Sequence, residues 1–341
     1  MRIATYNVEW FAGLFDQNDE LFNDSAWSRR WNVTRAQQTE ALGTVFRAMD
    51  ADAIMVIEAP DHGRNHSAVA ALEHFAQQFD IRARRAVIGF ANDTQQEIVL
   101  LYDPDVMTAA HDPMGEESGT KGARGAPRFD GSLRIDLDFD ASEDRVVFSK
   151  PPLELAVETR SGFAFRMIGA HLKSKAPHGA RDDNHAMQIA IANRRKQLAQ
   201  AIWLRERIDA HITDQTPLIL MGDLNDGPGL DEFENLFGRS SVEIILGADS
   251  AHPLYDPHAM RALSQRIGAV PTTSRFWIRP EKRFLQALLD YIMVCPALRA
   301  HAPQWRIWHP LDDPACWADQ TLREALVTAS DHFPVTLDID L

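Results

Sequence analysis

Leu218-Ile219-Leu220-Met221-Gly222-Asp223-Leu224-Asn225 is a run of apolar residues that ends in a carboxylate and an amide. A short apolar run of this kind is typical of a buried β-strand. Asp223 and Asn225 flank Leu224, so in an extended chain their side chains point to the same side. The segment therefore predicts a buried strand over 218–221 that presents two polar groups at its end.

The same pattern, an apolar strand-like run with a polar tip, recurs along the whole chain. The other tips are Tyr6-Asn7-Val8-Glu9-Trp10, Ile57-Glu58, His171-Leu172-Lys173-Ser174, Leu289-Asp290-Tyr291 and Ser330-Asp331-His332-Phe333. Strand ends converge in a sheet protein, so residues far apart in sequence can meet there. We expect these tips to form one site.

Hydrophobic periodicity predicts many strands, with helices between some of them. Strands are expected over 2–8, 52–57, 85–90, 97–102, 133–139, 146–148, 153–158, 163–170, 218–221, 288–294 and 335–341. Helices are expected over 34–49, 67–79 (capped by Ser67), 185–208 and 231–239, and loops over 111–127 and 240–286. Strands and helices do not alternate regularly, which favours two packed sheets flanked by helices over a doubly wound parallel sheet.

Length and composition fit one large two-sheet domain over residues 1–341, because 45% hydrophobic residues can fill a sizeable core. No apolar run approaches the ~20 residues that a membrane helix needs. The start of the sequence enters a strand pattern directly, with no sign of a signal peptide. Cys295 and Cys316 are the only cysteines, too few for a disulfide framework. We therefore expect a cytoplasmic protein.

The net charge of −14 argues against a protein that holds nucleic acid by bulk electrostatics. It does not exclude a metal-dependent enzyme that acts on phosphate, because local charge decides there. Lys173, Lys175 and Arg181 follow closely on His171 in this acidic chain. We expect this basic segment to contact flanking phosphates if the substrate is a polymer.

Carboxylates, amides and two histidines together suit one hard cation and one phosphate. Glu58 follows a buried strand, and a carboxylate there needs a partner, either a divalent cation or an arginine. Asp223 and Asn225 can orient a water molecule and hold a phosphate oxygen, although such a pair alone would usually close a turn.

The two histidines fit the same site. His171 is followed two residues later by Lys173, and both can contact phosphate. His332 can donate to a phosphate oxygen while Asp290 holds its other ring nitrogen, and Asp331 is then free to reach the metal. Alone, an Asp-His pair would be read as a surface turn.

Taken together, these tips resemble the endonuclease/exonuclease/phosphatase superfamily, the group of pancreatic-type deoxyribonuclease, apurinic endonucleases, inositol-polyphosphate 5-phosphatases and neutral sphingomyelinases. The resemblance spans residues 3–341 and is specific to the superfamily rather than to one substrate. It implies a deoxyribonuclease I-like fold, a four-layer α/β sandwich of two mixed β-sheets flanked by helices.

The resemblance also implies a metal side of the site. Glu58 matches the principal Mg²⁺ ligand, and Asn7 matches the amino-terminal asparagine. Glu9 falls where some members carry a second metal-side carboxylate, and Asp331 matches the closing metal-side aspartate. The cofactor implied is Mg²⁺, with Mn²⁺ as an alternative.

The catalytic side follows from the same resemblance. His171 matches the histidine that contacts the scissile phosphate, and Asp223 and Asn225 match the pair that orients the attacking water and binds phosphate. Asp290 matches the carboxylate that pairs with the last histidine, and His332 matches that transition-state histidine.

One position departs from the family pattern, and the assignment of another stays open. Lys150 stands where many members place an arginine before a proline, and lysine cannot grip phosphate bidentately. We still expect Lys150 to bind substrate, together with Asn7, Lys173 and Asn225. The deoxyribonucleases also place a glutamate near the start of the strand after a turn. Gln96 and Glu97 compete for this position, because the alternation of side chains along the strand does not decide which of them faces the site.

These observations predict a Mg²⁺-dependent phosphodiester hydrolase, with a nuclease acting on nucleic acid as the first hypothesis. A phosphatase or a lipid phosphodiesterase of inositol-phosphate or sphingomyelin type is the alternative that the acidic charge keeps open. A non-catalytic binding module is a third, and the complete catalytic set argues against it. Nothing in the sequence points to a protein partner. Residues 104–130, 174–186 and 240–286 are expected to form the rim of the site, and the shape of this rim would distinguish between these substrates.

Overall fold

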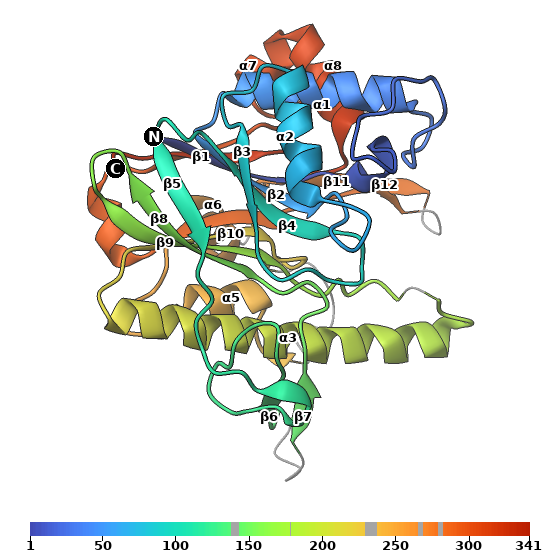
Figure 1. Ribbon diagram of the computed structural model, residues 1–341. Coiled ribbons are helices and arrows are strands. Elements are labelled where there is room, and N and C mark those ends of the chain that lie inside the picture. The colour runs from blue at the N-terminus through green and yellow to red at the C-terminus, as the bar shows by residue number, and fades with distance from the viewer. Residues whose placement is uncertain (138–142, 178, 229–236, 265–268, 279–281) are drawn as a thin grey trace.

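The computed structural model describes residues 1–137, 143–177, 179–228, 237–264, 269–278 and 282–341. In this part of the chain two mixed β-sheets pack face to face, and helices cover their outer faces (Figure 1). One sheet has the order β14-β15-β1-β2-β4-β3 and the other the order β13-β10-β9-β8-β5. The four-layer sandwich expected from the sequence is therefore confirmed.

The strands of the first sheet come from both ends of the sequence. They are β14 (Gln304–Ile307), β15 (Val335–Asp338), β1 (Arg2–Asn7), β2 (Ala53–Ala59), β4 (Glu97–Tyr102) and β3 (Arg85–Ile88). The strands of the second sheet are β13 (Asp290–Val294), β10 (Leu218–Asp223), β9 (Ala164–His171), β8 (Leu153–Thr159) and β5 (Met107–His111). Two hairpins stand apart from the sandwich, β6 (Leu133–Ile135) with β7 (Asp144–Val146), and β11 (Ser274–Ile278) with β12 (Arg283–Ala287).

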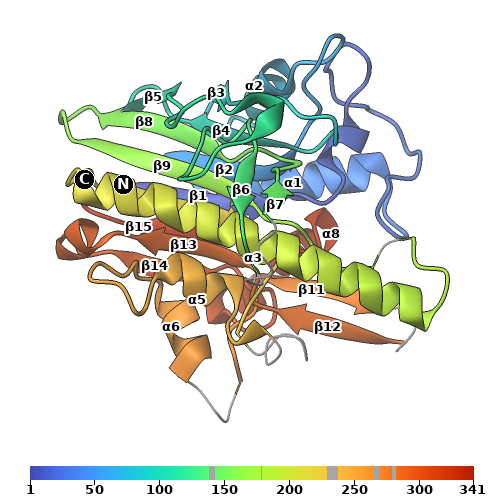
Figure 2. The ribbon, with the colours of Figure 1, turned by 90° about the horizontal axis from the view of Figure 1, so that it is seen from below.

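The helices form the two outer layers (Figures 1 and 2). The first sheet is covered by α1 (Arg35–Met49), α2 (Ala68–Gln78), α7 (Pro314–Ala318) and α8 (Gln320–Ala329). On the side of the second sheet lie α3 (Asp183–Thr213), α5 (Ser241–Leu246) and α6 (Pro257–Ser264). Short 3₁₀ helices are η1 (Phe11–Leu14), η2 (Gly119–Lys121) and η3 (Pro296–Ala300). None of the helices in the described ranges has the length and apolar character that crossing a membrane requires.

Strand β2 explains why its sequence reads as an unbroken apolar run. Met55 and Ile57 face the core between the two sheets, whereas Ile54 and Val56 face the layer of α1 and α2. Because both faces are buried, no polar residue alternates with the apolar ones. Helix α2 begins where the sequence predicted, since the Ser67 hydroxyl accepts a hydrogen bond from the amide of Ala70 at 3.2 Å.

Most expected elements are present with shifted ends. Helix α3 begins two residues earlier and ends five residues later than the predicted 185–208. The helix expected over 231–239 falls largely outside the described residues, as does the end of the strand expected over 133–139. Strands β5 and β14 and helices α7 and α8 were not predicted.

The loop prediction for 240–286 is wrong. This segment contains α5, α6, β11 and β12. Helix α5 is short, yet it carries a capping box in which Ser240 and Glu243 satisfy each other's backbone amides, a signal that the sequence offered. Strands β11 and β12 form an exposed hairpin with no fully buried face, so hydrophobic alternation could not reveal them.

Candidate active site

A cavity of about 530 Å³ opens at the end of the sandwich where β1, β2, β9 and β10 finish. Its walls include nearly all the residues that the sequence singled out: Asn7, Glu9, Glu58, Lys150, His171, Lys173, Asp223, Asn225, Asp331 and His332. Asp290 does not line the cavity but lies directly behind His332. The structure thus brings all the predicted tips together.

Three of these residues form a row across the second sheet. In the register of β9, β10 and β13, His171 pairs with Asp223, and Asp223 pairs with Asp290. Gly222, with φ of +133°, allows this close approach, because a Cβ there would lie 2.0 Å from the carbonyl oxygen of Ala170. The sheet itself therefore fixes the spacing of the histidine and the two carboxylates.

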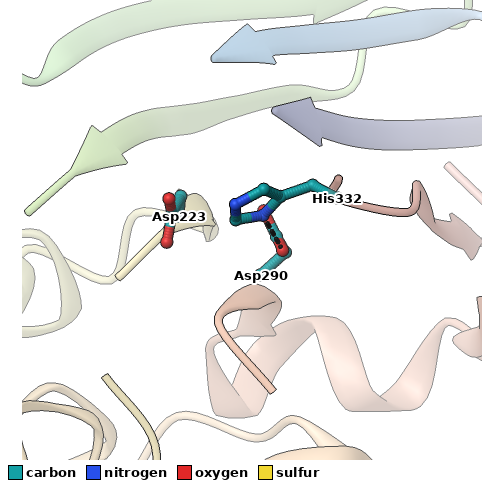
Figure 3. A group of neighbouring side chains, drawn as sticks. All are labelled: Asp223, Asp290 and His332. Atoms are coloured by element: carbon teal, nitrogen blue, oxygen red, sulfur yellow. Dashed lines mark hydrogen bonds and ion pairs between the residues drawn. The ribbon is translucent and has the colours of Figure 1, made fainter. Parts of the chain in front are cut away.

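His332 approaches this row from the segment that enters β15 (Figure 3). Its Nδ1 lies 2.8 Å from Oδ2 of Asp290, and the hydroxyl of Thr273 donates to the same oxygen at 2.7 Å. Burial lowers the pKa of His332, but the charges of Asp290, Asp223 and Asp331 more than offset this and hold the pKa well above its ordinary value. The site thus stabilises a protonated His332.

His171 is the opposite case. Its Nδ1 lies 3.1 Å from Nζ of Lys150, and its Nε2 lies 3.6 Å from Oδ2 of Asp223. Burial, Lys150 and His332 together hold the pKa of His171 well below its ordinary value. One histidine of the site is therefore kept neutral and the other charged.

Asp223 is held between two amides. The side chain of Asn7 donates to its Oδ2 at 2.9 Å, and the backbone amide of Asn225 donates to its Oδ1 at 2.7 Å. Burial raises the pKa of Asp223 to about 7, with Asp290 adding to the effect and His332 opposing it. A carboxylate with a pKa near neutrality is suited to accept a proton from water.

Glu58 reaches the cavity because β2 carries a bulge at this residue. The pairing of β2 with β4 shifts between Ile57 and Ala59, and Glu58 has φ of +60°. Bulges of this kind redirect a side chain next to active sites. Nε2 of Gln96 donates to Oε2 of Glu58 at 2.7 Å, whereas Glu97 is buried and binds the side chain of Asn92. Of the two competing residues, Gln96 is the one that faces the site.

Three carboxylates crowd this side of the cavity. Burial raises the pKa of Glu58, and Asp331 raises it further against Lys150 and His332. Burial and Asp331 raise the pKa of Glu9 to about 7, although Arg30 forms an ion pair with it. The side-chain oxygen of Asn7 is buried among them without a hydrogen-bond partner. This set of oxygen donors fits a hard divalent cation.

Buried polar side chains outside the motifs hold these tips in place. The Ser330 hydroxyl donates to the carbonyl oxygen of Asn7 at 2.8 Å and accepts from the amides of Glu9 and His332. The side-chain amide of Gln38 on α1 donates to the carbonyl oxygen of Glu9 at 2.8 Å. The two ends of the chain are thereby locked to each other at the cavity.

Helix α3 holds the opposite wall. Nε2 of Gln197 donates to the carbonyl oxygens of Lys173 at 3.0 Å and Asn225 at 2.9 Å. The side chain of Gln200 accepts from the amide of Lys173 at 2.9 Å. The sequence did not point to Gln38, Gln197, Gln200 or Thr273. A signal for the three glutamines was helical spacing, since each stands three or four residues before apolar residues (Ala41 and Leu42, Ala201, Trp203 and Leu204), on a face where a polar side chain needs a specific partner.

The basic segment after His171 departs from expectation at one residue. Nζ of Lys175 lies 2.6 Å from Oδ1 of Asp226, which is fully buried and also binds Arg194. Lys173 lines the cavity, and Arg181 is exposed. Lys175 therefore carries a structural ion pair rather than an uncompensated charge for substrate.

The family model described as "Endonuclease/Exonuclease/phosphatase family" matches residues 4–332. The chain belongs to this family. It is accordingly a hydrolase of phosphoric esters. The comparison with curated proteins finds no match.

Solved structures share the fold at low sequence identity. TDP2 from Caenorhabditis elegans superimposes with a TM-score of 0.50 at 11% identity, covering 100% of this chain and 74% of that one. An endonuclease/exonuclease/phosphatase family protein from Bacteroides thetaiotaomicron has a TM-score of 0.50 at 14% identity, covering 99% of this chain and 93% of that one.

Proposed function

We propose that the protein is a Mg²⁺-dependent phosphodiester hydrolase that cleaves nucleic acid. The observation that carries the proposal is the row of His171, Asp223 and Asp290 with His332 facing it, at the edge of a cavity that also holds the carboxylates Glu9, Glu58 and Asp331. This arrangement pairs a proton acceptor for water with donors for a phosphate.

Asp223 is the group that orients the attacking water and takes its proton. Its two oxygens are fixed by Asn7 and Asn225, so the carboxylate is held in one orientation. The water oxygen then forms a bond to phosphorus while the bond to the leaving oxygen breaks. Asn225 lines the same cavity and is placed to hold a phosphate oxygen.

The two histidines act on the phosphate. His332, held by Asp290, stabilises the negative charge that builds on the phosphate oxygens. His171 is neutral and accepts from Lys150 at Nδ1, so its Nε2–H is the side that can donate to a phosphate oxygen. Lys150 and Lys173 add positive charge to the phosphate side of the cavity.

Glu58, Glu9, Asp331 and the unpartnered oxygen of Asn7 are the residues that would hold Mg²⁺ or Mn²⁺. Bound there, the cation would neutralise charge on the phosphate. The buried group of Asp223, Asp290 and His332 also has the spacing of a metal site. We assign it to proton transfer instead, because Oδ2 of Asp290 already accepts from Thr273 and pairs with Nδ1 of His332.

A phosphatase or lipid phosphodiesterase is the second candidate, favoured by the net charge of −14. Incubation with duplex DNA, RNA, sphingomyelin and a phosphoinositide, each with Mg²⁺ and with EDTA, separates the candidates. We expect metal-dependent cleavage of at least one nucleic acid. Hydrolysis confined to sphingomyelin or the phosphoinositide would favour the second candidate, and no hydrolysis of any of the four substrates would contradict both.

Two substitutions test the assigned roles. Asp223→Asn and His332→Ala should each lower kcat by orders of magnitude while the protein stays folded. The loss of one group that stabilises the transition state costs about 3–4 kcal/mol in comparable sites. A wild-type kcat in either variant, with folding checked by circular dichroism, would show that the role is assigned to the wrong residue.

A further inference from the structure

Exposed aromatic rings that the proposed chemistry does not use lie on the cavity wall and on the β11–β12 hairpin, which contacts Asp331 and His332. We propose that they bind the bases of an unpaired nucleic acid strand on two platforms. The first platform is Trp10 with Arg29, and the second is the hairpin pair Trp277 and Phe284 with Arg275. This inference rests on the proposed function and names the form of the substrate.

Trp10 belongs to the cavity wall and is 40% exposed. Its backbone has φ of +59°, a left-handed conformation that is unfavourable for a bulky residue. The conformation is imposed from both sides, since Glu9 is fixed through its amide and carbonyl and η1 begins at Phe11. The chain therefore holds a large ring at the mouth of the cavity instead of burying it.

A guanidinium group stands over this ring. Cζ of Arg29 lies 5.5 Å from the centroid of the Trp10 ring, within the range of a cation–π contact. Arg29 belongs to the sequence Trp27-Ser28-Arg29-Arg30-Trp31, in which Arg29 is exposed, the two tryptophans are 67% and 90% exposed, and Arg30 is half-buried against Glu9. Arginines interleaved with exposed tryptophans are typical of surfaces that bind nucleic acid strands.

The second platform lies on the β11–β12 hairpin. Trp277 and Phe284 are paired across the two strands, with ring centroids 5.1 Å apart, and they are 50% and 47% exposed. Cζ of Arg275 lies 3.6 Å from the centroid of the Phe284 ring. A pair of large rings left in water on a hairpin contributes nothing to the core of the fold.

The hairpin is attached directly to the catalytic residues. Ser274 forms a β-bridge with His332, and the amide of Arg275 donates to the carbonyl oxygen of Asp331 at 2.7 Å. In both views the hairpin, the N-terminal end of α3 and the loop that precedes α1 gather at one end of the molecule (Figures 1 and 2). A strand with its phosphate in the cavity can therefore meet Trp10 on the cavity wall and, past Asp331 and His332, the hairpin.

Unpaired bases are the chemistry that fits these surfaces. A base in a duplex is already stacked and paired, whereas an unpaired base offers its face to an aromatic ring regardless of its sequence. The arginines over the rings add local positive charge to a chain whose net charge is −14. Stacking gives this acidic protein a source of affinity that does not depend on overall charge.

A lipid surface is the other occupant for exposed rings, and the sequence of the hairpin argues against it. The residues that join β11 to β12 are Arg279-Pro280-Glu281-Lys282, three of them charged. Burial of such a sequence in the hydrocarbon region of a membrane is unfavourable. A hairpin that inserts into lipid would carry apolar residues at this position.

The test compares two strands of equal length, a single-stranded oligonucleotide and the same chain with abasic sites in place of the bases. Binding is measured by fluorescence anisotropy in EDTA, and cleavage of the same oligonucleotide is measured with Mg²⁺. The variant is Trp277→Ala with Phe284→Ala. A ring-preserving variant, Trp277→Tyr with Phe284→Tyr, guards against loss of folding.

Trp317→Ala is the matched control. Trp317 on α7 is 55% exposed and also carries an arginine, with Cζ of Arg323 at 4.7 Å from its ring centroid. It lies on α7, which covers the first sheet, whereas the tested rings lie on the β11–β12 hairpin. The control therefore removes the same kind of surface ring away from the proposed platforms.

We expect the wild type to bind the oligonucleotide at least about tenfold more tightly than the abasic chain, since a stacked base contributes on this order. The double alanine variant should lose a large part of this difference, because only the Trp10 platform is left, while the tyrosine variant and Trp317→Ala keep it. An equal loss on both strands, or none, would overturn the inference. So would binding of the wild type to phosphatidylcholine vesicles that the alanine variant loses without a change in oligonucleotide binding.

The outcome also separates this inference from the proposed function. If the wild type cleaves no nucleic acid in Mg²⁺, the proposed function fails. If it cleaves the oligonucleotide but binds it no better than the abasic chain, the proposed function stands and the aromatic platforms are not base-binding surfaces.

Discussion

Nζ of Lys150 lies 3.1 Å from Nδ1 of His171. A lysine ammonium group carries only donors, so Nδ1 of His171 must be the acceptor and Nε2 must carry the ring hydrogen. That hydrogen faces Asp223 and Glu58, whose oxygens lie 3.6 and 3.9 Å from Nε2. A lysine therefore sets which nitrogen of His171 is presented to the phosphate.

Lys150→Met should lower kcat by about 10²–10³-fold, the usual loss when one preorganised donor in an active site is removed. The substitution keeps the length of the side chain but leaves His171 without the donor that fixes its tautomer. Lys150→Arg should recover part of the loss, because a guanidinium can still donate to Nδ1. Steady-state kinetics on the preferred substrate measure both variants, and an unchanged kcat in Lys150→Met would disprove the role of this contact.

The Asp290–His332 pair depends on Thr273, whose hydroxyl donates to Asp290 and accepts from its amide. Asp290→Asn should reduce kcat by about 10²–10⁴-fold, as for other histidines that lose their orienting carboxylate. Thr273→Val should cause a smaller loss, since Asp290 keeps its contact with His332. The control is Thr272→Val, because the neighbouring Thr272 points to Gln286 at 3.5 Å. Equal effects of the two valine substitutions on kcat would contradict this argument.

Metal binding should appear in stability as well as in activity. The charge of Asp331 helps to raise the pKa of Glu9 and of Glu58, so a cation among these carboxylates relieves repulsion in the folded state. Mg²⁺ should therefore raise Tm, by an amount that corresponds to about 2.7 kcal/mol at 100 times its Kd. Glu58→Gln should raise Tm without metal and reduce the increase that Mg²⁺ causes.

Differential scanning calorimetry with EDTA and with Mg²⁺ measures these shifts. Glu40→Gln, a substitution at an exposed position on α1, serves as the control that removes one negative charge elsewhere. An equal Mg²⁺ response in wild type and Glu58→Gln would place the cation on other residues. Full activity in EDTA would show that no metal is needed.

The sequence predicted the residues that meet at the candidate site better than it predicted the residues that hold them in place. A single tip has an ordinary structural explanation, such as a turn or a salt bridge, but several apolar runs with polar ends lay in one chain and together indicated one site. The supporting residues could not be found in this way. Thr273 and Gln197 act through contacts 17 and 28 residues away, which depend on the packing of the whole sandwich.

Local irregularity limited the prediction in two further places. The choice between Gln96 and Glu97 depended on strand parity, and the bulge at Glu58 breaks the pairing on which parity relies. The sequence of the β11–β12 hairpin shows no alternation of apolar and polar residues, because both faces of the hairpin are partly exposed to solvent. In both cases the deviation from regular structure occurs beside the site, where bulges and exposed hairpins are common.

Lys175 is the residue at which sequence and structure lead to opposite predictions. The sequence placed it with Arg181 among the cations that contact a polymeric substrate. In the structure its ammonium group lies 2.6 Å from a carboxylate oxygen of Asp226, which also accepts from the backbone amide of Ser241. We therefore expect Lys175→Met to lower the free energy of unfolding by about 1–3 kcal/mol, since a buried charge loses one of its partners. Arg181→Ala should leave stability unchanged.

The pH dependence of stability distinguishes these roles further. Burial raises the pKa of Asp226, but Lys175 and Arg194 more than offset this, so its pKa in the folded protein is lowered. A carboxyl group with a lowered pKa stabilises the folded protein at pH values above its ordinary pKa of about 3.9. This stabilisation is lost as the pH falls through the pKa that the group has in the folded protein. The difference in stability between wild type and Asp226→Asn should therefore be largest near neutral pH and narrow below about pH 4.

Urea unfolding at several pH values measures this difference, and binding of a polymeric substrate at several salt concentrations completes the comparison. Arg181→Ala should reduce the slope of log K for substrate binding against log salt concentration by about the amount expected for one lost phosphate contact. Lys175→Met should leave this slope unchanged. If Lys175→Met instead flattens the salt dependence and leaves stability unchanged, the ion pair with Asp226 opens on binding. Lys175 would then belong to the substrate surface, as its position in the sequence suggested.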